Sequence, residues 1–187
     1  MEQNIIINLQ KNGNIFWDIF FQIQSNIASW VGVLCLFLVI ILFINKKFGI
    51  FFGYGFLVTI GFNYLLKVIV NRPRPFEANS QIINKLSTIG KSFPSGHMVS
   101  ATFMVLSILF LLYMLNKSGK LNVLSKTWCK ILVITLGVIF VILTGIARLY
   151  LGQHYITDLL GGVIVAFIGF FITAVMYKKL DKTTFKE

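Results

Sequence analysis

The 187-residue sequence predicts an all-α fold, a polytopic transmembrane helical bundle with five strong spans. Hydrophobic residues make up 57% of the chain and charged residues only 12%, whereas a soluble domain has about 25% charged residues. The apolar residues also fall in runs long enough to cross a bilayer. These observations exclude a disordered chain and a fibrous repeat. We expect one membrane-embedded domain over residues 1–187.

Residues 1–27 precede the first strong apolar segment. Between residues 14 and 27, aromatic and aliphatic side chains recur at helical spacing, but polar residues interrupt them. That mixture is typical of an amphipathic helix in the membrane interface. The sequence therefore predicts an interfacial N-terminal helix, with a sixth short span as the alternative.

Residues 28–177 form the predicted helical core. Each of its apolar segments falls in or near the roughly 17–25 residues that a membrane-spanning helix needs. The five segments are Ala28–Ile44, Phe48–Val70, Met98–Leu115, Ile131–Ala147 and Leu159–Tyr177.

The positive charges predict how this bundle is oriented. The net charge is +11, but 10 of the 17 Lys and Arg residues follow the first, third and fifth spans, including those of the basic tail, residues 178–187. The positive-inside rule makes that side cytoplasmic, so the charge predicts no nucleic-acid partner. The loops 71–97 and 148–158 are then expected on the outer face of the plasma (inner) membrane.

Three short motifs fall on this outer face. Lys67 and Arg74 flank the end of the second span, Pro94–His97 precedes the third, and Arg148 begins the connection to the fifth. A lysine at the end of an apolar helix is costly without a partner, and arginine forks suit a tetrahedral oxyanion. Three cations with few acids nearby favour a phosphate. Snorkelling or anchoring to lipid headgroups is the alternative for each cation taken alone.

The Pro94–His97 motif lies at a predicted helix start. Free backbone N–H groups favour an anion there, and Gly96 permits close approach. The Ser95 hydroxyl either caps the helix or donates to a phosphate oxygen.

Both histidines of the chain lie on the outer face. His154 and Asp158 are four residues apart and share a helical face, so the carboxylate can hold the imidazole in one tautomer and leave the other nitrogen as a nucleophile. His97 is then the general acid for the leaving oxygen. A zinc site is disfavoured because no cysteine lies on this face and the cations repel a metal ion.

Together the motifs resemble the signature of the type 2 phosphatidic acid phosphatase superfamily. That signature reads K-x6-R-P, P-S-G-H and S-R-x5-H-x3-D, and ten of its specified positions match within residues 67–158. Ala147 stands where the family usually has a serine. We expect this change to weaken or alter the headgroup preference, because it removes a possible hydrogen bond to phosphate.

The resemblance implies metal-independent hydrolysis of a phosphomonoester or pyrophosphate, with no cofactor and with vanadate as an inhibitor. It implies that His154 attacks phosphorus to form a phosphohistidine, that Asp158 orients His154, and that His97 protonates the leaving lipid oxygen. The groups expected to hold the phosphate are Lys67, Arg74, Arg148, the Ser95 hydroxyl and the Gly96 amide.

A membrane-embedded site implies a lipid phosphate or diphosphate as substrate. By analogy with the family, the preferred substrate is undecaprenyl diphosphate, which would become undecaprenyl phosphate, and the alternatives are phosphatidylglycerol phosphate, phosphatidic acid and diacylglycerol pyrophosphate. A non-catalytic phospholipid-binding or transport protein is an alternative of another class. Both histidines and Asp158 disfavour it, because binding alone would need only the cations.

Overall fold

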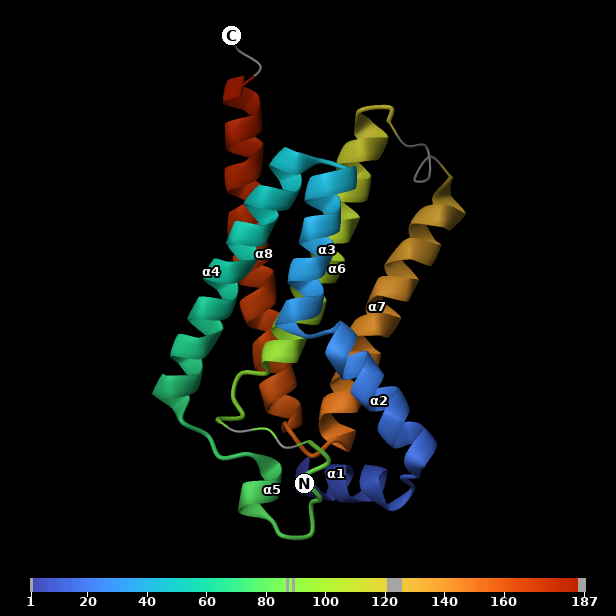
Figure 1. Ribbon diagram of the computed structural model, residues 1–187, viewed down its shortest axis with the longest axis vertical. Coiled ribbons are helices and arrows are strands. Elements are labelled where there is room, and N and C mark those ends of the chain that lie inside the picture. Colours follow the sequence, from blue (N-terminus) through green and yellow to red (C-terminus); the bar gives the residue numbers. More distant parts are fainter. Residues whose placement is uncertain (1, 87, 89, 121–125, 185–187) are drawn as a thin grey trace.

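The computed structural model describes residues 2–86, 88, 90–120 and 126–184, and these residues form an all-helical bundle without strands (Figure 1). The helices in chain order are α1 (Glu2–Lys11), α2 (Ile15–Ile27), α3 (Trp30–Phe43), α4 (Lys46–Val70), α5 (Pro75–Ala78), α6 (Gly96–Lys117), α7 (Thr127–Tyr150) and α8 (Ile156–Thr184).

Helices α4, α6, α7 and α8 are long and apolar enough to cross a membrane. The predicted first span differs from the others. Its helix, α3, has 14 residues, or about 21 Å, which is shorter than the roughly 30 Å hydrocarbon core. Helices α2 and α3 pass the same test only as a pair bent by 51°. The predicted class, a helical membrane bundle, is confirmed, with four spanning helices among the described residues, or five if the bent pair is counted as one span.

Side-chain caps set where the early helices begin. Ser29 Oγ accepts a hydrogen bond from Gly32 N at 3.2 Å at the start of α3, and Asn45 Oδ1 accepts one from Phe48 N at 2.9 Å at the start of α4. Such caps satisfy N–H groups that have no partner within the helix. Ser29 therefore restarts the helix after the bend that follows α2.

Helix α6 is the centre of the bundle, because it contacts α3, α4, α7 and α8. A cluster of buried aromatic rings fills the space between α3, α4, α6 and α8. Phe52 and Phe56 of α4 are fully buried there, and Phe103 of α6 packs against Phe56 with ring centroids 5.5 Å apart. This core fixes the positions of α4 and α6, which carry two of the three motifs.

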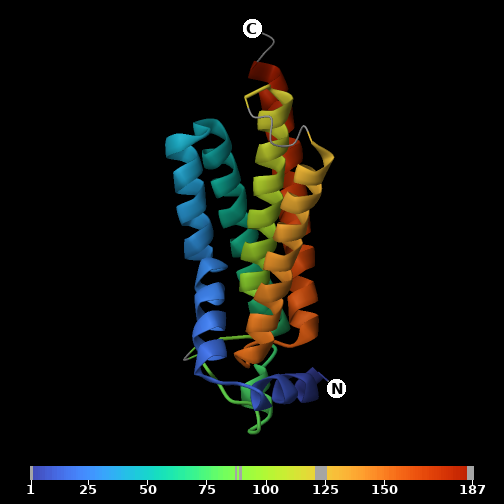
Figure 2. The same cartoon turned by 90° about the vertical axis from the view of Figure 1, so that its right-hand side faces the viewer.

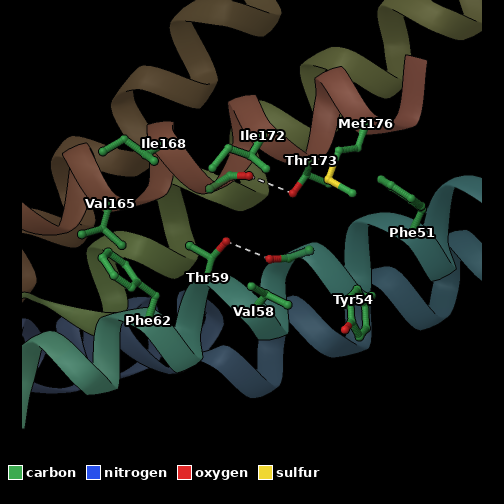
Figure 3. Close-up of a pocket in the computed structure, with 12 residues that line it drawn as sticks. Phe51, Tyr54, Val58, Thr59, Phe62, Val165, Ile168, Ile172, Thr173 and Met176 are labelled. Atoms are coloured by element: carbon green, nitrogen blue, oxygen red, sulfur yellow. Dashed lines mark hydrogen bonds between the residues drawn. The ribbon is translucent and has the colours of Figure 1, made fainter. Parts of the chain in front are cut away.

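Helices α4 and α8 cross closely through small residues. Added methyl groups at Gly55 and Gly169 would overlap the side chains of Thr173 and Thr59, respectively. Each threonine hydroxyl donates to the carbonyl four residues earlier in its own helix, Thr59 to Gly55 O at 2.7 Å and Thr173 to Gly169 O at 2.8 Å (Figure 3). Beside the crossing lies an apolar cavity of about 480 Å³, the α4–α8 groove, lined among others by Phe51, Tyr54, Val58, Phe62, Ile168, Ile172 and Met176.

The N-terminal segment contains two helices, α1 and α2. The sequence pattern predicts an interfacial helix or a short sixth span before residue 28. In α2 the polar side chains of Gln24 and Ser25 are buried against α7, whereas Phe16 and Ile27 are more than half exposed. An apolar outer face is what a helix in contact with lipid presents. Helix α1 instead lies across the end of the bundle in Figures 1 and 2.

All three motifs lie at the end of the bundle that α1 crosses (Figure 1). The α3–α4 turn and the last turns of α6 and α8 lie at the opposite end. The chain therefore alternates between ends as the charge pattern predicts. Of the predicted basic tail, residues 178–184 continue α8, and residues 185–187 lie outside the described residues.

Candidate active site

A pocket of about 230 Å³ opens where α4 ends and α6 begins. It brings together side chains from all three motifs, although the sequence separates them by up to 87 residues. Six of the eight predicted site residues line it, namely Lys67, Arg74, Gly96, His97, Arg148 and His154.

The end of α4 places the first motif. The helix terminates at Asn71, which adopts a left-handed conformation with φ of 50°, and Pro73 and Pro75 then prevent it from continuing. Lys67 remains in the last helical turn. Its Nζ donates to the carbonyl oxygens of Lys91 at 2.9 Å and Ser92 at 3.3 Å, in the segment that leads into α6.

Ser95 caps the second motif. Its buried hydroxyl accepts from Met98 N at 3.5 Å, and its own N–H donates to the carbonyl oxygen of Asp158 at 3.0 Å. Of the two roles open from sequence, the structure shows the helix cap. Ser95 is not among the residues that line the pocket, but it joins the start of α6 to α8 and so places Gly96 and His97.

A tight turn after α7 places His154. Gly152 has a φ of 74°, and a side chain there would meet the Ile83 carbonyl at 2.6 Å. Glycine tolerates both constraints. The turn carries Gln153 and His154 back into the bundle, where they are 0% and 2% exposed.

Asp158 lies directly behind His154. Its Oδ2 atom is 3.6 Å from His154 Nδ1 and accepts a hydrogen bond from the Tyr155 N–H at 2.9 Å. The carboxylate is fully buried and outside the pocket lining. It therefore faces Nδ1, the nitrogen that it is expected to orient.

Arg72 contacts the same carboxylate, a pairing that the sequence did not predict. Its Nη1 donates to Asp158 Oδ1 at 2.8 Å, and its guanidinium carbon lies 3.9 Å above the centre of the Tyr155 ring. Nη2 reaches Glu2 of α1 at 3.3 Å, and Glu2 also accepts from the Thr157 N–H at 2.9 Å. Arg72 thus holds the residue behind His154 rather than the pocket.

The electrostatics of the pocket keep His154 neutral. Burial lowers the pKa of His154 well below its usual 6.5, and the positive charges of Arg148, Lys67 and Arg74 lower it further. A neutral imidazole retains the lone pair that a nucleophile needs. Asp158 therefore does not hold His154 as a cation at pH 7.

Arg74 is held by Gln153, which the motif leaves unspecified. Arg74 Nη1 donates to Gln153 Oε1 at 2.7 Å, and Arg74 Nε donates to Gly90 O at 2.8 Å. Gln153 is fixed in turn by Asn84, which accepts from its Nε2 at 2.8 Å. The position of Gln153 next to His154 in the sequence was the only signal that could have predicted this role.

Arg148 is held by α2. Its Nη1 donates to Ser25 Oγ at 2.6 Å, while Nε has no hydrogen-bond partner among the described residues. Ala147 points elsewhere, into a buried cluster with Phe21, Tyr150 and Leu151. The hydroxyl beside Arg148 therefore comes from α2, and polar residues interrupting an apolar helix were the signal that could have found it.

We call Lys67, Arg74 and Arg148 the phosphate clamp, after the role expected of them from the sequence. Within the described part of the chain, none of the three pairs with a carboxylate. They contact carbonyl, amide and hydroxyl oxygens instead, so their charges are not neutralised. Three such cations around a neutral histidine favour a bound anion of high charge.

The chain belongs to the PAP2 superfamily, whose family model matches residues 48–182. The match includes every motif described above and thus confirms the resemblance drawn from the sequence.

Two curated relatives from Bacillus subtilis (strain 168) are similar to the chain. It is 30% identical over 124 residues to the undecaprenyl-diphosphatase BcrC, and 36% identical over 120 residues to phosphatidylglycerophosphatase B. These alignments cover 66% and 64% of the chain but 55% and 53% of the relatives. The chain therefore spans about half the length of each.

Two crystal structures share the fold. One, a transmembrane PAP2-type phosphatidylglycerolphosphate phosphatase from Bacillus subtilis, matches with a TM-score of 0.79 at 25% identity over 95% of this chain and 85% of that one. The other, LpxE of Aquifex aeolicus, matches with a TM-score of 0.65 at 19% identity over 91% and 93%.

Proposed function

We propose that the protein is a metal-independent lipid phosphatase that removes a terminal phosphate through a phosphohistidine intermediate. The single observation that carries this proposal is the pocket in which buried His154 lies with the unneutralised phosphate clamp. Phosphoryl transfer depends mainly on positioning and charge stabilisation, and this pocket supplies both.

In the first step, His154 Nε2 attacks phosphorus and the bond from phosphorus to the leaving oxygen breaks. The negative charge of the bound phosphate favours protonated His97, which gives its proton to that oxygen. The Nδ1 proton of His154 faces Asp158, and we expect their 3.6 Å contact to tighten in the transition state. The clamp and the Gly96 N–H hold the three remaining phosphate oxygens.

In the second step, water attacks the same phosphorus and the bond to Nε2 breaks. The proton of the water passes to His97, so phosphate leaves and both histidines return to their starting forms. Vanadate mimics the five-coordinate phosphorus of either step, and we expect it to inhibit.

The substrate of this reaction is a lipid of the membrane that holds the bundle. By the charge pattern, the pocket faces the outer side of the plasma membrane. Undecaprenyl diphosphate and phosphatidylglycerol phosphate are the two leading candidates, since relatives of the chain are named for each. They differ in the leaving group, a lipid phosphate in the first and a glycerol in the second.

The test is phosphate release by purified protein in detergent and excess EDTA. The panel contains both leading candidates, phosphatidic acid and diacylglycerol pyrophosphate. We expect release from at least one lipid, and loss of release by at least about 10³-fold in His154→Ala, as for other nucleophile deletions. Tyr54→Phe, which changes only the α4–α8 groove, is the matched control and keeps wild-type activity. Full activity in His154→Ala, or a strict need for added metal, would contradict the proposal.

A further inference from the structure

Two buried polar side chains of the pocket belong to none of the motifs. Asn63 of α4 and Ser100 of α6 both line it, and each is 1% exposed. Asn63 Oδ1 and Ser100 Oγ have no hydrogen-bond partner among the described residues. Leaving such a buried group unpaired costs roughly 1–3 kcal/mol, so a pair of them in one cavity indicates a ligand that satisfies both.

These two residues, here called the inner polar tier, lie deeper in the bundle than the clamp. Asn63 is one helical turn before Lys67, and Ser100 is one turn after Gly96, a displacement of about 6 Å in each helix. The two helices meet there, because a methyl group on Gly96 would lie 3.5 Å from Asn63 Nδ2. The next pocket residue on α4 is the apolar Ile60.

The pocket therefore changes character with depth, from cationic through neutral and polar to apolar. A phospholipid with a terminal phosphate has the same order, because the phosphate is followed by the leaving group and then by hydrocarbon. His97 stands on α6 between Gly96 and Ser100, so the leaving oxygen that it protonates is next to the inner polar tier.

The chemistry of the tier selects among leaving groups. Both side chains are neutral, and Asn63 Oδ1 accepts a hydrogen bond but cannot donate one. A lipid phosphate as leaving group carries negative charge, and neither of these neutral side chains supplies a cation to balance it. A hydroxyl group donates to Asn63 and accepts from Ser100, and it brings no charge into the pocket.

We propose that Asn63 and Ser100 bind a free hydroxyl group on the leaving group of a glycerol-type phospholipid. This inference rests on the proposed function and deepens it. It favours phosphatidylglycerol phosphate over undecaprenyl diphosphate, and so reverses the order suggested by sequence analogy.

The test compares two lipids that differ by one hydroxyl group. The first is phosphatidylglycerol phosphate, and the second is the same lipid with a propanediol linker in place of the glycerol that bears the terminal phosphate. We expect wild-type kcat/KM to favour the first by about tenfold or more, the value of one or two hydrogen bonds. In Asn63→Leu and in Ser100→Ala the ratio falls toward one, because these variants lose more of their kcat/KM on phosphatidylglycerol phosphate than on the propanediol lipid.

Thr59→Val is the matched control. Thr59 is one turn from Asn63 on α4, but its hydroxyl already donates a hydrogen bond to Gly55 O, and the residue lines the α4–α8 groove rather than the pocket. We expect this variant to keep the wild-type ratio. Ser100→Ala removes a single oxygen, so it reports on the tier even if Asn63→Leu does not fold.

Two results would overturn the inference while leaving the proposed function intact. One is a wild-type ratio near one, and the other is a ratio that stays unchanged in both variants because the losses on the two lipids are equal. Wild-type protein that releases phosphate from no lipid of the panel would instead contradict the proposed function, and the inner polar tier would lose its basis with it.

Discussion

The two cavities along α4 have opposite characters, although the same helix lines both. In the α4–α8 groove, the hydroxyls of Thr59 and Thr173 donate to backbone carbonyls of their own helices, and the remaining lining is apolar. In the pocket, Asn63 Oδ1, Ser100 Oγ and Arg148 Nε are buried without a hydrogen-bond partner among the described residues. Helix packing thus satisfies the hydroxyls of the larger cavity, whereas the smaller cavity leaves polar atoms with which a ligand can pair.

The largest effect on this contrast is expected from Lys67→Met. The substitution keeps the length of the side chain but removes one cation of the phosphate clamp. Loss of one group that stabilises transition-state charge costs about 10²–10³-fold in rate. Steady-state phosphate release gives the value, with Met176→Leu in the groove as a control expected to retain activity. A loss below threefold would place the phosphate elsewhere.

A smaller effect is expected from Arg72→Gln, which tests the pairing behind the pocket. The change removes the positive charge that pairs with Asp158. The carboxylate is then free to stabilise protonated His154, so the pKa of His154 rises from its lowered position. We expect kcat/KM to fall by about 10–100-fold, as for other supporting residues.

The pH profile distinguishes this role from a purely structural one. Because the neutral form of His154 is the nucleophile in the proposed mechanism, the acid limb of kcat/KM is expected well below pH 6.5 in the wild type and at higher pH in Arg72→Gln. A lower rate with an unshifted acid limb would mean that Arg72 only supports the fold.

The smallest effect on chemistry is expected on the groove side. In Gly169→Ala the new methyl group overlaps Thr59 at the α4–α8 crossing, and overpacking of this kind costs about 1–3 kcal/mol. We expect a lower thermal midpoint in detergent with kcat/KM of the folded protein nearly unchanged. Adding Thr59→Ala should restore part of the midpoint. An activity loss larger than the stability loss would mean that the groove takes part in the reaction.

The sequence predicted those parts of the molecule that follow from local patterns. Apolar runs located α4, α6, α7 and α8, and the motif spacings located the clamp and both histidines. The sequence did not show which face of α2 is buried, because its polar residues are paired with groups on α7 more than 100 positions away. The polar residues of α2 indicate that it makes buried polar contacts, but no local pattern encodes which helix supplies their partners.

The supporting residues escaped prediction for the same reason. Arg72 pairs with a carboxylate 86 positions later, and Gln153 holds an arginine 79 positions earlier. Asn63 gave a weak signal, as an amide in an apolar helix one turn from Lys67. Its importance depends on the helix that faces it, and only the folded bundle shows that Ser100 shares its cavity.

The stereochemical course at phosphorus tests the central claim most directly. A substrate whose terminal phosphate is chiral through oxygen isotopes reports how many displacements occur, since each one inverts the configuration. Attack by His154 followed by attack of water makes two displacements. When an acceptor alcohol replaces water and takes the phosphoryl group from His154, the account therefore predicts net retention. Net inversion would show direct transfer to the acceptor and would contradict the phosphohistidine intermediate.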